Sequence, residues 1–207
     1  MMLRPSPAPA PALRSVLAAL GSPTAVNEAR TPALRAAQGP LSPELPLPVH
    51  VLDVRDQVVD VRDQVTPSGQ APRTRLVGWR FLIRGTDRAV AAADTMITPD
   101  GWSFSHFFEG PYLTATERAL LQAEALPTTY QPRLLSVPEL YMLTLWLHGD
   151  TESDGASSSP DPADLLIPLA PAPPGIAAHR PHLVADLLPV LTLRLAPPPL
   201  FGTPAPA

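Results

Sequence analysis

The distribution of proline is the feature that most constrains how this chain folds. Proline accounts for 30 of the 207 residues and is concentrated toward the two ends. It removes a backbone hydrogen-bond donor and fixes φ, so proline-rich runs favour extended, solvated chain. Residues 1–47, which contain no aromatic residue, are therefore predicted to be a Pro/Ala-rich, largely disordered tail, with one short helix candidate at 12–20. Residues 197–207 are predicted to be a second disordered tail.

A tandem heptapeptide repeat follows the first tail. VLDVRDQ at 51–57 is followed directly by VVDVRDQ at 58–64. A strand alternates faces at every residue, so an insertion of seven residues moves its apolar side chains to the opposite face. The many β-branched residues disfavour a helix. We therefore expect a strand over 49–65 with a bulge or kink near 57–59, and with Asp53 and Asp60 pointing outward.

Three further strand patterns come after the repeat. The sequence at 75–84 is rich in aromatic and branched residues, 89–97 is a weaker strand, and 102–108 alternates after the turn signal at 99–101. The links between these strands are too short for parallel crossovers. Together with the repeat, they predict a four-stranded antiparallel meander.

Two helices are predicted in the second half of the chain. The pattern at 113–126 is amphipathic, with Thr114 as the N-cap and Glu117 at the spacing of a capping box. The stretch 182–195 also favours a helix. Pro189 lies inside it, however, and the alternation after this proline leaves a strand open for the last part.

A pair of apolar runs predicts a hairpin between these helices. The runs at 140–147 and 164–169 favour buried strands, although the first also fits a helix that starts near Ser136. Pro168 would place the second strand at a sheet edge. The polar, acidic sequence at 149–163 joins the two runs and is predicted to be a flexible loop.

These patterns predict an α+β fold in which residues 48–196 form a single domain. The expected sheet is antiparallel, with about five or six strands and with two or three helices packed on one face.

Composition excludes several classes of function. The net charge of −4 gives no overall attraction to nucleic acid or acidic membranes. All 15 basic residues are arginine, which we interpret as coding bias. The absence of cysteine excludes disulfides, a thiolate nucleophile and cysteine-ligated metals. No apolar run reaches the roughly 20 residues of a membrane-spanning helix, so we expect a cytoplasmic protein without a membrane partner.

Basic residues cluster around the second predicted strand, where 73–88 contains five arginines and one acid. Simple alternation places Arg73 and Arg75 on the face of Trp79. Arginines beside aromatic side chains can hold single-stranded nucleic acid by phosphate contacts and base stacking. We favour the alternative, a solvated face neutralised by the aspartates of the repeat. The candidate ligand-binding residues are Arg73, Arg75, Trp79, Arg80, Arg84 and Arg88.

Two small groups of polar residues are weaker candidates. His106 and Glu109 lie close to serines, but Ser105 and His106 point to opposite faces of the predicted strand, which argues against a nucleophilic site. His179 and His182 lack a convincing third ligand for zinc. No catalytic residue, metal or cofactor is therefore predicted.

The missing catalytic pattern and the flexible tails favour a non-catalytic binding or interaction module of unknown ligand, with a protein as the expected partner. The first alternative is a nucleic-acid-binding protein that uses the arginine-rich strand at 73–88. The second alternative is an enzyme with a site near His106 and Glu109.

Overall fold

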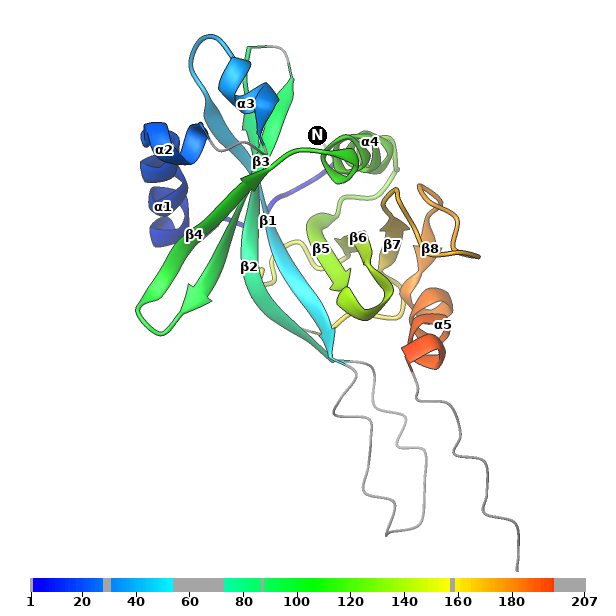
Figure 1. Ribbon diagram of the computed structural model, residues 1–207. Coiled ribbons are helices and arrows are strands. Elements are labelled where there is room, and N and C mark those ends of the chain that lie inside the picture. The colour runs from blue at the N-terminus through cyan, green and yellow to red at the C-terminus, as the bar shows by residue number, and fades with distance from the viewer. Residues whose placement is uncertain (1, 28–30, 54–72, 87, 157–158, 196–207) are drawn as a thin grey trace, which may run out of the picture.

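The computed structural model shows one mixed β-sheet of eight strands with helices on both of its faces (Figure 1). It describes residues 2–27, 31–53, 73–86, 88–156 and 159–195. The strand order is β4-β3-β2-β1-β5-β6-β7-β8. The predicted α+β class is confirmed, but the sheet is larger than the five or six strands expected, because two strands have no clear pattern in the sequence.

The first four strands form the predicted antiparallel meander. They are β1 (Ser42–Asp53), β2 (Arg73–Arg84), β3 (Ala89–Thr98) and β4 (Gly101–Phe108). β1 begins earlier than predicted despite its prolines. Its pairing with β2 shifts between Glu44 and Leu47, and Leu45 has a positive φ of 50°. An irregularity of this kind interrupts the hydrogen-bond ladder, which is where a strand tolerates proline.

The remaining strands are β5 (Gln131–Val137), β6 (Met142–His148), β7 (Leu165–Pro168) and β8 (His182–Leu183). β6 and β7 pair antiparallel, which confirms the predicted hairpin of apolar strands. The helical alternative near Ser136 is limited to one 3₁₀ turn at Pro138–Leu140. β5 is not predicted from the sequence, because Pro132 and Arg133 interrupt its apolar pattern.

One strand pair departs from the antiparallel expectation. β1 and β5 are parallel, through the pairs Val49–Leu134, His50–Leu135 and Val51–Ser136. The chain between β4 and β5, two strands that run in opposite directions, contains the helix Pro111–Glu124 and passes over the intervening strands to place β5 beside β1. The prediction of a purely antiparallel sheet is therefore wrong at this position, because β5 joins the sheet beside β1 rather than beside β4.

Three helices from the N-terminal segment pack on the sheet: α1 (Ala10–Leu20), α2 (Pro23–Val26) and α3 (Pro32–Ala36). Ala12 and Val16 of α1 and Leu34 of α3 are buried against β2, β3 and β4. The sequence predicts a largely disordered tail over 1–47 with a helix candidate at 12–20, whereas the structure shows three helices in the described part of this segment and places several of their side chains in the core. Each helix has a proline in its first turn, where the missing N–H removes no helical hydrogen bond.

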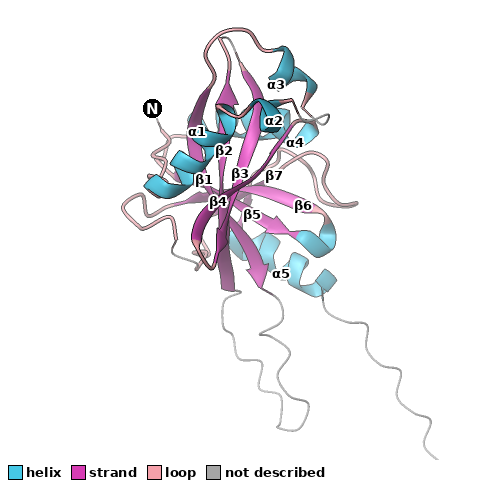
Figure 2. Ribbon diagram, turned by 60° about the vertical axis from the view of Figure 1, so that its left-hand side comes forward, coloured by secondary structure: helices cyan, strands magenta, loops and turns pink. Residues whose placement is uncertain are grey.

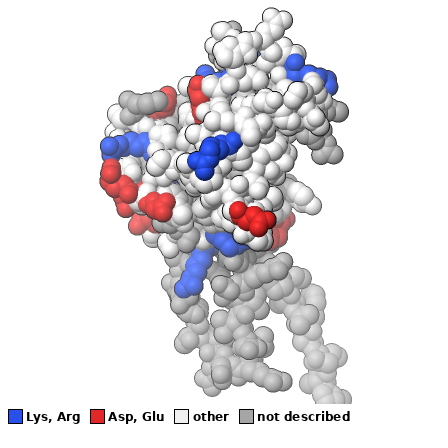
Figure 3. Space-filling view, turned by 90° about the vertical axis from the view of Figure 1, so that its left-hand side faces the viewer, with Lys and Arg blue, Asp and Glu red and all other residues white. Residues whose placement is uncertain are grey.

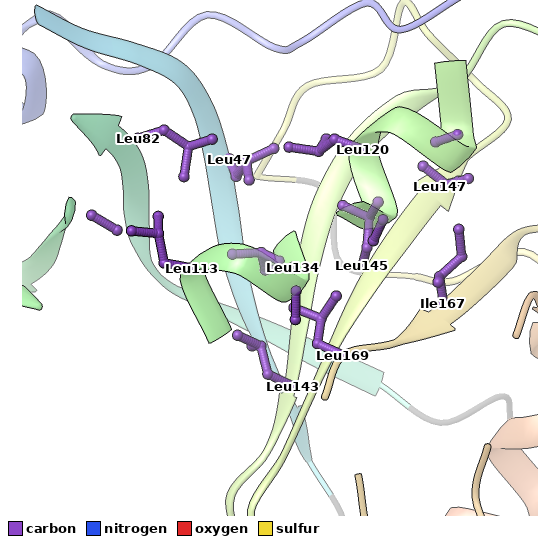
Figure 4. Close-up of a cluster of buried hydrophobic side chains, with 14 of the residues drawn as sticks. Leu47, Leu82, Leu113, Leu120, Leu134, Leu143, Leu145, Leu147, Ile167 and Leu169 are labelled. Atoms are coloured by element: carbon purple, nitrogen blue, oxygen red, sulfur yellow. The ribbon is translucent and has the colours of Figure 1, made fainter. Parts of the chain in front are cut away.

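The opposite face of the sheet is covered by α4 (Pro111–Glu124). Its buried residues join leucines of β1, β2, β5 and β6 in an apolar cluster (Figure 4). Thr116, Ala119, Leu120 and Ala123, at spacings of three and four, face the core, as the amphipathic pattern at 113–126 predicts, and Leu121 outside this stripe is exposed.

The predicted N-terminal cap of this helix is wrong. Gly110, with a positive φ of 121°, occupies the N-cap, Pro111 starts the helix, and Thr114 lies inside it. Glu117 instead accepts a hydrogen bond from the backbone N–H of Ala89 (3.4 Å). Proline at the first helical position therefore marks the start of α4 better than the capping-box spacing does.

The last helix, α5 (Val184–Leu195), continues through Pro189, so the helical interpretation of 182–195 is right from Val184 onward, while His182 and Leu183 form β8. It packs against β5, β6 and β7 on the face opposite to α4. Helices therefore cover both faces, rather than one as predicted, and Figure 2 shows α1 and α5 at different parts of the sheet. No helix of the described residues is long and apolar enough to cross a membrane.

A bulge in β2 changes the alternation read from the sequence. Val49 pairs with Gly78 and His50 with Leu76, which leaves Val77 as an extra residue. Thr74 therefore shares a face with Trp79, and the expectation that Arg73 and Arg75 do so is wrong.

A second bulge lies in β4, where Asp94 pairs with His106 and Thr95 with Phe104, which leaves Ser105 unpaired. As a result Phe107 is buried beside Phe104, with ring centroids 4.6 Å apart, and His106 is exposed.

The repeat falls mostly outside the described residues. β1 includes its first three residues, Val51–Asp53, and the register places Asp53 opposite Arg73. The predicted bulge near 57–59 and the position of Asp60 lie outside the described residues.

The first prediction concerns Gly78 on β2, where the backbone of β3 leaves no room for a side chain. A Cβ added at Gly78 would lie 2.1 Å from the carbonyl oxygen of Thr95 on β3. Since backbone cannot yield as a flexible side chain does, Gly78→Ala is expected to lower the free energy of unfolding by about 3 kcal/mol.

Gly85→Ala is the matched control, because its nearest contact would be 3.5 Å from a side-chain methyl of Val90. It is expected to change stability by less than about 0.5 kcal/mol. Urea denaturation followed by tryptophan fluorescence measures both variants, and equal stabilities would contradict the close approach.

Candidate functional site

Several polar and charged side chains are buried together on the face of the sheet that α1 and α5 cover. We call this group the buried polar cluster, and its residues are His50, Thr74, Gln131, Arg133, Trp146, His148 and Asp164. Burying such groups costs free energy unless each finds a hydrogen-bond partner, so their partners reveal what the cluster does.

The register of the sheet explains why these residues meet. Arg133 on β5 lies opposite Trp146 on β6, and Gln131 lies opposite His148, so that two neighbouring rows share one face. His50 comes from β1, which lies next to β5 in the parallel pair.

The indole ring of Trp146 is the centre of the cluster. Its ring centroid lies 5.2 Å from that of His50 and 5.5 Å from that of His148, both in edge-on arrangements. The guanidinium carbon of Arg133 lies 4.8 Å from the same indole, at a distance typical of a cation–π contact.

The carboxylate of Asp164, just before β7, anchors the cluster through four hydrogen bonds. Oδ2 accepts from Trp146 Nε1 (2.7 Å), His148 Nδ1 (2.7 Å) and the backbone N–H of Asp161 (3.0 Å), and Oδ1 accepts from the backbone N–H of Gly149 (2.9 Å). Burial by itself would raise the pKa of Asp164, but these donors stabilise the ionised form and lower the pKa below its usual value.

The guanidinium of Arg133 is fully buried and binds the sequence that follows β6. It donates to Gln131 Oε1 (2.8 Å), Ser153 Oγ (2.7 Å) and the carbonyl oxygen of Asp154 (3.2 Å). Burial lowers its pKa to about 10, so it stays charged at neutral pH. The cluster therefore combines one buried cation with one buried carboxylate.

The imidazole of His50 is held in one tautomer by its partners. Nε2 lies 2.9 Å from the carbonyl oxygen of Gly155, which can only accept, so Nε2 carries the hydrogen. Nδ1 is then free to accept from the hydroxyl of Thr74 (3.4 Å). Burial lowers the pKa of His50 to about 4, with a smaller contribution from the charge of Arg133. His50 is therefore neutral at physiological pH.

The pairing of His148 with Asp164 resembles the oriented imidazole of a general base, with Nδ1 fixed by a carboxylate. Its side chain is 11% exposed. A nucleophilic mechanism also needs a hydroxyl or thiol within hydrogen-bond reach of the other ring nitrogen. No described residue hydrogen-bonds to His148 Nε2, and the hydroxyl of Ser153 is bound to Arg133 and to the carbonyl oxygen of Asp150.

The side chains of the buried polar cluster instead bind the segment that follows β6, at residues 153–155, to the face of the sheet. Gln131 Nε2 donates to the carbonyl oxygen of Ser153 (2.8 Å), while Arg133 and His50 bind the next two carbonyl groups along the chain. Ser6, from the N-terminal segment, accepts from the N–H of Gly155 (3.2 Å). The sequence predicts a flexible loop over 149–163, and the structure shows that part of it is bound by buried side chains.

The arginine-rich strand does not gather its side chains at one place. At about 3.3 Å per residue, β2 spans about 36 Å from Arg73 to Arg84. Arg73, Arg75 and Arg88 are exposed, and Trp79 is buried in the core.

The other two arginines are paired with acids from neighbouring strands. Arg80 makes two hydrogen bonds to Asp94 on β3 (2.8 and 2.9 Å) and lies 4.3 Å from the ring centre of Phe108. Arg84 is 3.2 Å from Glu44 on β1. The partners of these two arginines are therefore not the aspartates of the repeat.

His106 and Glu109, the residues of the second alternative function, make hydrogen bonds to different parts of the structure. Glu109 accepts from the N–H groups of Ala33 (3.1 Å) and Leu34 (2.9 Å), at the start of α3. His106 is exposed and contacts its neighbour Ser105 (3.0 Å). The carboxylate and the imidazole thus have different partners.

The two C-terminal histidines also have separate surroundings. The carbonyl oxygen of His179 accepts from Gln122 on α4, whereas His182 lies opposite Leu166, whose side chain packs under α5. Across the described part of the chain, no three His, Asp or Glu side chains form a group that could hold a metal ion.

Sequence reasoning missed the buried polar cluster, although part of its signal is present. His148 directly follows the predicted apolar strand at 140–147 and Asp164 begins the next at 164–169, so a hairpin brings them together. Arg133 and Gln131 give no such signal, because β5 was not predicted: its polar residues and Pro132 interrupt the apolar pattern of a strand.

Comparison with protein-family models, curated proteins and solved structures finds no match to this chain.

The buried imidazole generates the second prediction. The folded-state pKa of His50 is about 4 and its usual value is 6.5. Below pH 6.5 His50 becomes protonated in the unfolded chain but stays neutral in the folded chain. The contribution of His50 to the free energy of unfolding is therefore full above pH 6.5 and is lost as the pH falls toward 4. Two and a half pKa units correspond to about 3 kcal/mol.

His50→Gln is the discriminating variant, because its amide nitrogen can still donate to Gly155 but does not titrate. The free energy of unfolding, measured by urea denaturation between pH 4 and pH 7, is expected to depend less on pH in this variant. Parallel pH profiles for the two proteins would contradict the neutral, buried state of His50.

Proposed function

We propose that this chain is a non-catalytic interaction module, and that it binds a protein partner through the free edge of β4. Pairing with an exposed sheet edge is a general mode of protein recognition, in which main-chain hydrogen bonds supply much of the affinity.

The composition and position of β4 carry this proposal. The strand is eight residues long, pairs with β3 on one side, and has no strand on its other side among the described residues. Its sequence, GWSFSHFF, contains no proline, acid or arginine. Proteins usually protect a sheet edge with charged residues, proline, bulges or a very short strand. Apart from the bulge at Ser105, β4 has none of these devices.

The opposite end of the sheet provides a contrast within the same molecule. β8 has only two residues, follows directly after Pro181 and leads into α5. It is therefore too short to pair with an added strand, and β4 is the edge suited to binding.

The buried polar cluster supports a non-catalytic role. In the described part of the chain, its charged and titratable groups are hydrogen-bonded to the backbone and side chains that they hold in place. These groups serve the fold, which leaves the edge of the sheet as the feature suited to a partner.

The third prediction tests β4 with a photo-crosslinking amino acid placed at Ser103, and at Thr128 in the exposed turn between α4 and β5 as the matched control. In native lysate, the Ser103 probe is expected to capture proteins that the Thr128 probe does not, and excess unlabelled protein is expected to compete. Identical capture from both positions would contradict binding at β4.

Nucleic-acid binding is the second candidate, favoured by the exposure of Arg73, Arg75 and Arg88. Because Arg80 and Arg84 are paired with acids, we expect few phosphate contacts. The fourth prediction is weak binding to single-stranded oligonucleotides, with a salt dependence of about two or three phosphate contacts. Fluorescence anisotropy over a salt series measures it, with Arg73→Gln/Arg75→Gln as the test variant. Tight binding that this variant does not weaken would contradict a site at these residues.

A further inference from the structure

We infer that the partner of β4 is a second copy of this chain, paired antiparallel through β4 to form a two-fold dimer with a continuous sheet. This inference rests on the proposed function, since it takes the free edge of β4 as the binding surface.

Self-pairing is geometrically simple for an edge strand. The hydrogen-bond pattern of an antiparallel pair is the same when viewed from either strand, so one edge can pair with its own copy about a two-fold axis. The regular part of β4, Gly101–Phe104, precedes the bulge at Ser105 and offers an uninterrupted ladder. We assign the pairing to this part, which places Ser103 near the two-fold axis.

Charge favours a copy of the chain over a charged peptide. When a strand pairs with itself, any charged side chain near the centre meets its own copy, and like charges directly opposite are destabilising. Gly101–Phe104 has no ionisable side chain, so self-pairing meets no such repulsion. The same segment offers no counter-charge for an acidic or basic peptide.

Exposed apolar side chains also lie on the elements next to β4. Leu13 and Leu17 on α1, which packs against β4, are 36% and 49% exposed. Met96 and Ile97 on β3, opposite Ser103 and Trp102, are 47% and 54% exposed. Figure 3, which views this side of the molecule, shows separate charged groups divided by uncharged surface. Met96 and Ile97 lie on the paired side of β4, away from its free edge, so they extend the apolar surface around the strand without contacting the added strand directly.

The lack of cysteine in the chain makes the fifth prediction directly testable. Ser103→Cys introduces a single thiol near the proposed axis, and Thr128→Cys introduces one in an exposed turn away from β4. Under mild oxidation, Ser103→Cys is expected to give a disulfide-linked dimer as its main product, and Thr128→Cys is expected to stay largely monomeric. Equal cross-linking of the two variants would overturn the inference.

Sedimentation velocity over a wide concentration range supplies an independent measurement. The unmodified chain is expected to sediment as a dimer at high concentration. Ser103→Lys places like charges near the axis, and is expected to weaken the dimer roughly tenfold or more, with Thr128→Lys unchanged. Circular dichroism confirms that both lysine variants are folded.

The outcomes separate this inference from the proposed function. A monomer at all concentrations, with specific capture by the Ser103 photo-probe, would overturn self-pairing and support another protein at β4. A monomer without specific capture would overturn both. A dimer that is insensitive to Ser103→Lys would place the contact elsewhere and would overturn the assignment to β4.

Discussion

The parallel pairing of β1 with β5 is the constraint on which the rest of the structure depends. It joins an antiparallel meander, β1 to β4, to a second antiparallel unit, β5 to β8, through three residue pairs. Each half has its own apolar cluster on one face, under α1 and α3 or under α5, while α4 spans the join on the other face. The buried polar cluster lies over this join, since His50 belongs to β1 and Arg133 belongs to β5. Its hydrogen bonds therefore connect the two halves, because His50 and Arg133 bind neighbouring carbonyl groups of the same segment.

Linking the two halves of the sheet through buried charged groups costs free energy, because these groups lose their hydration. A buried cation and a buried carboxylate rarely add much net stability, because the loss of hydration offsets their attraction. These groups make directional contacts, and the present register satisfies the four hydrogen bonds of Asp164 together with the carbonyl contact of Arg133. A slip of one residue between β5 and β6 would move Arg133 to the apolar face under α4, and such a slip is correspondingly disfavoured.

The sequence predicts the local parts of this fold well and the long-range parts poorly. The aromatic and branched composition of β2 and β4, the apolar run of β6 and the amphipathic pattern of α4 are properties of neighbouring residues, so they can be read directly. The parallel pairing of β5 depends on residues more than eighty positions apart and leaves no local pattern. The helix candidate at 12–20 corresponds to α1, whereas α2 and α3 were not predicted, because the effect of proline depends on whether it stands in the first turn or in the middle of a helix. Bulges at Val77 and Ser105 reverse the alternation without a sequence signal, which is why Thr74, and not Arg73 or Arg75, shares the face of Trp79, and why Phe107 is buried. For the same reason, the residues of the buried polar cluster could be recognised only after the register was known.

The two ends of the sheet then explain why one edge is suited to association. In a mixed sheet built from two halves, the outermost strand of each half is an unprotected edge unless the chain covers it. The C-terminal half ends in β8, a strand of two residues that turns directly into α5, so that its edge offers almost no ladder. The N-terminal half ends in the full length of β4, with aromatic residues in place of charges and with α1 packed on one face. Covering the edge of β4 with another helix would require additional residues next to β4. Pairing it with β4 of a second copy requires no additional residues. The same absence of charge that leaves β4 open to unwanted pairing is what allows two copies to meet there without repulsion, because an edge that must pair with itself cannot be protected by charge.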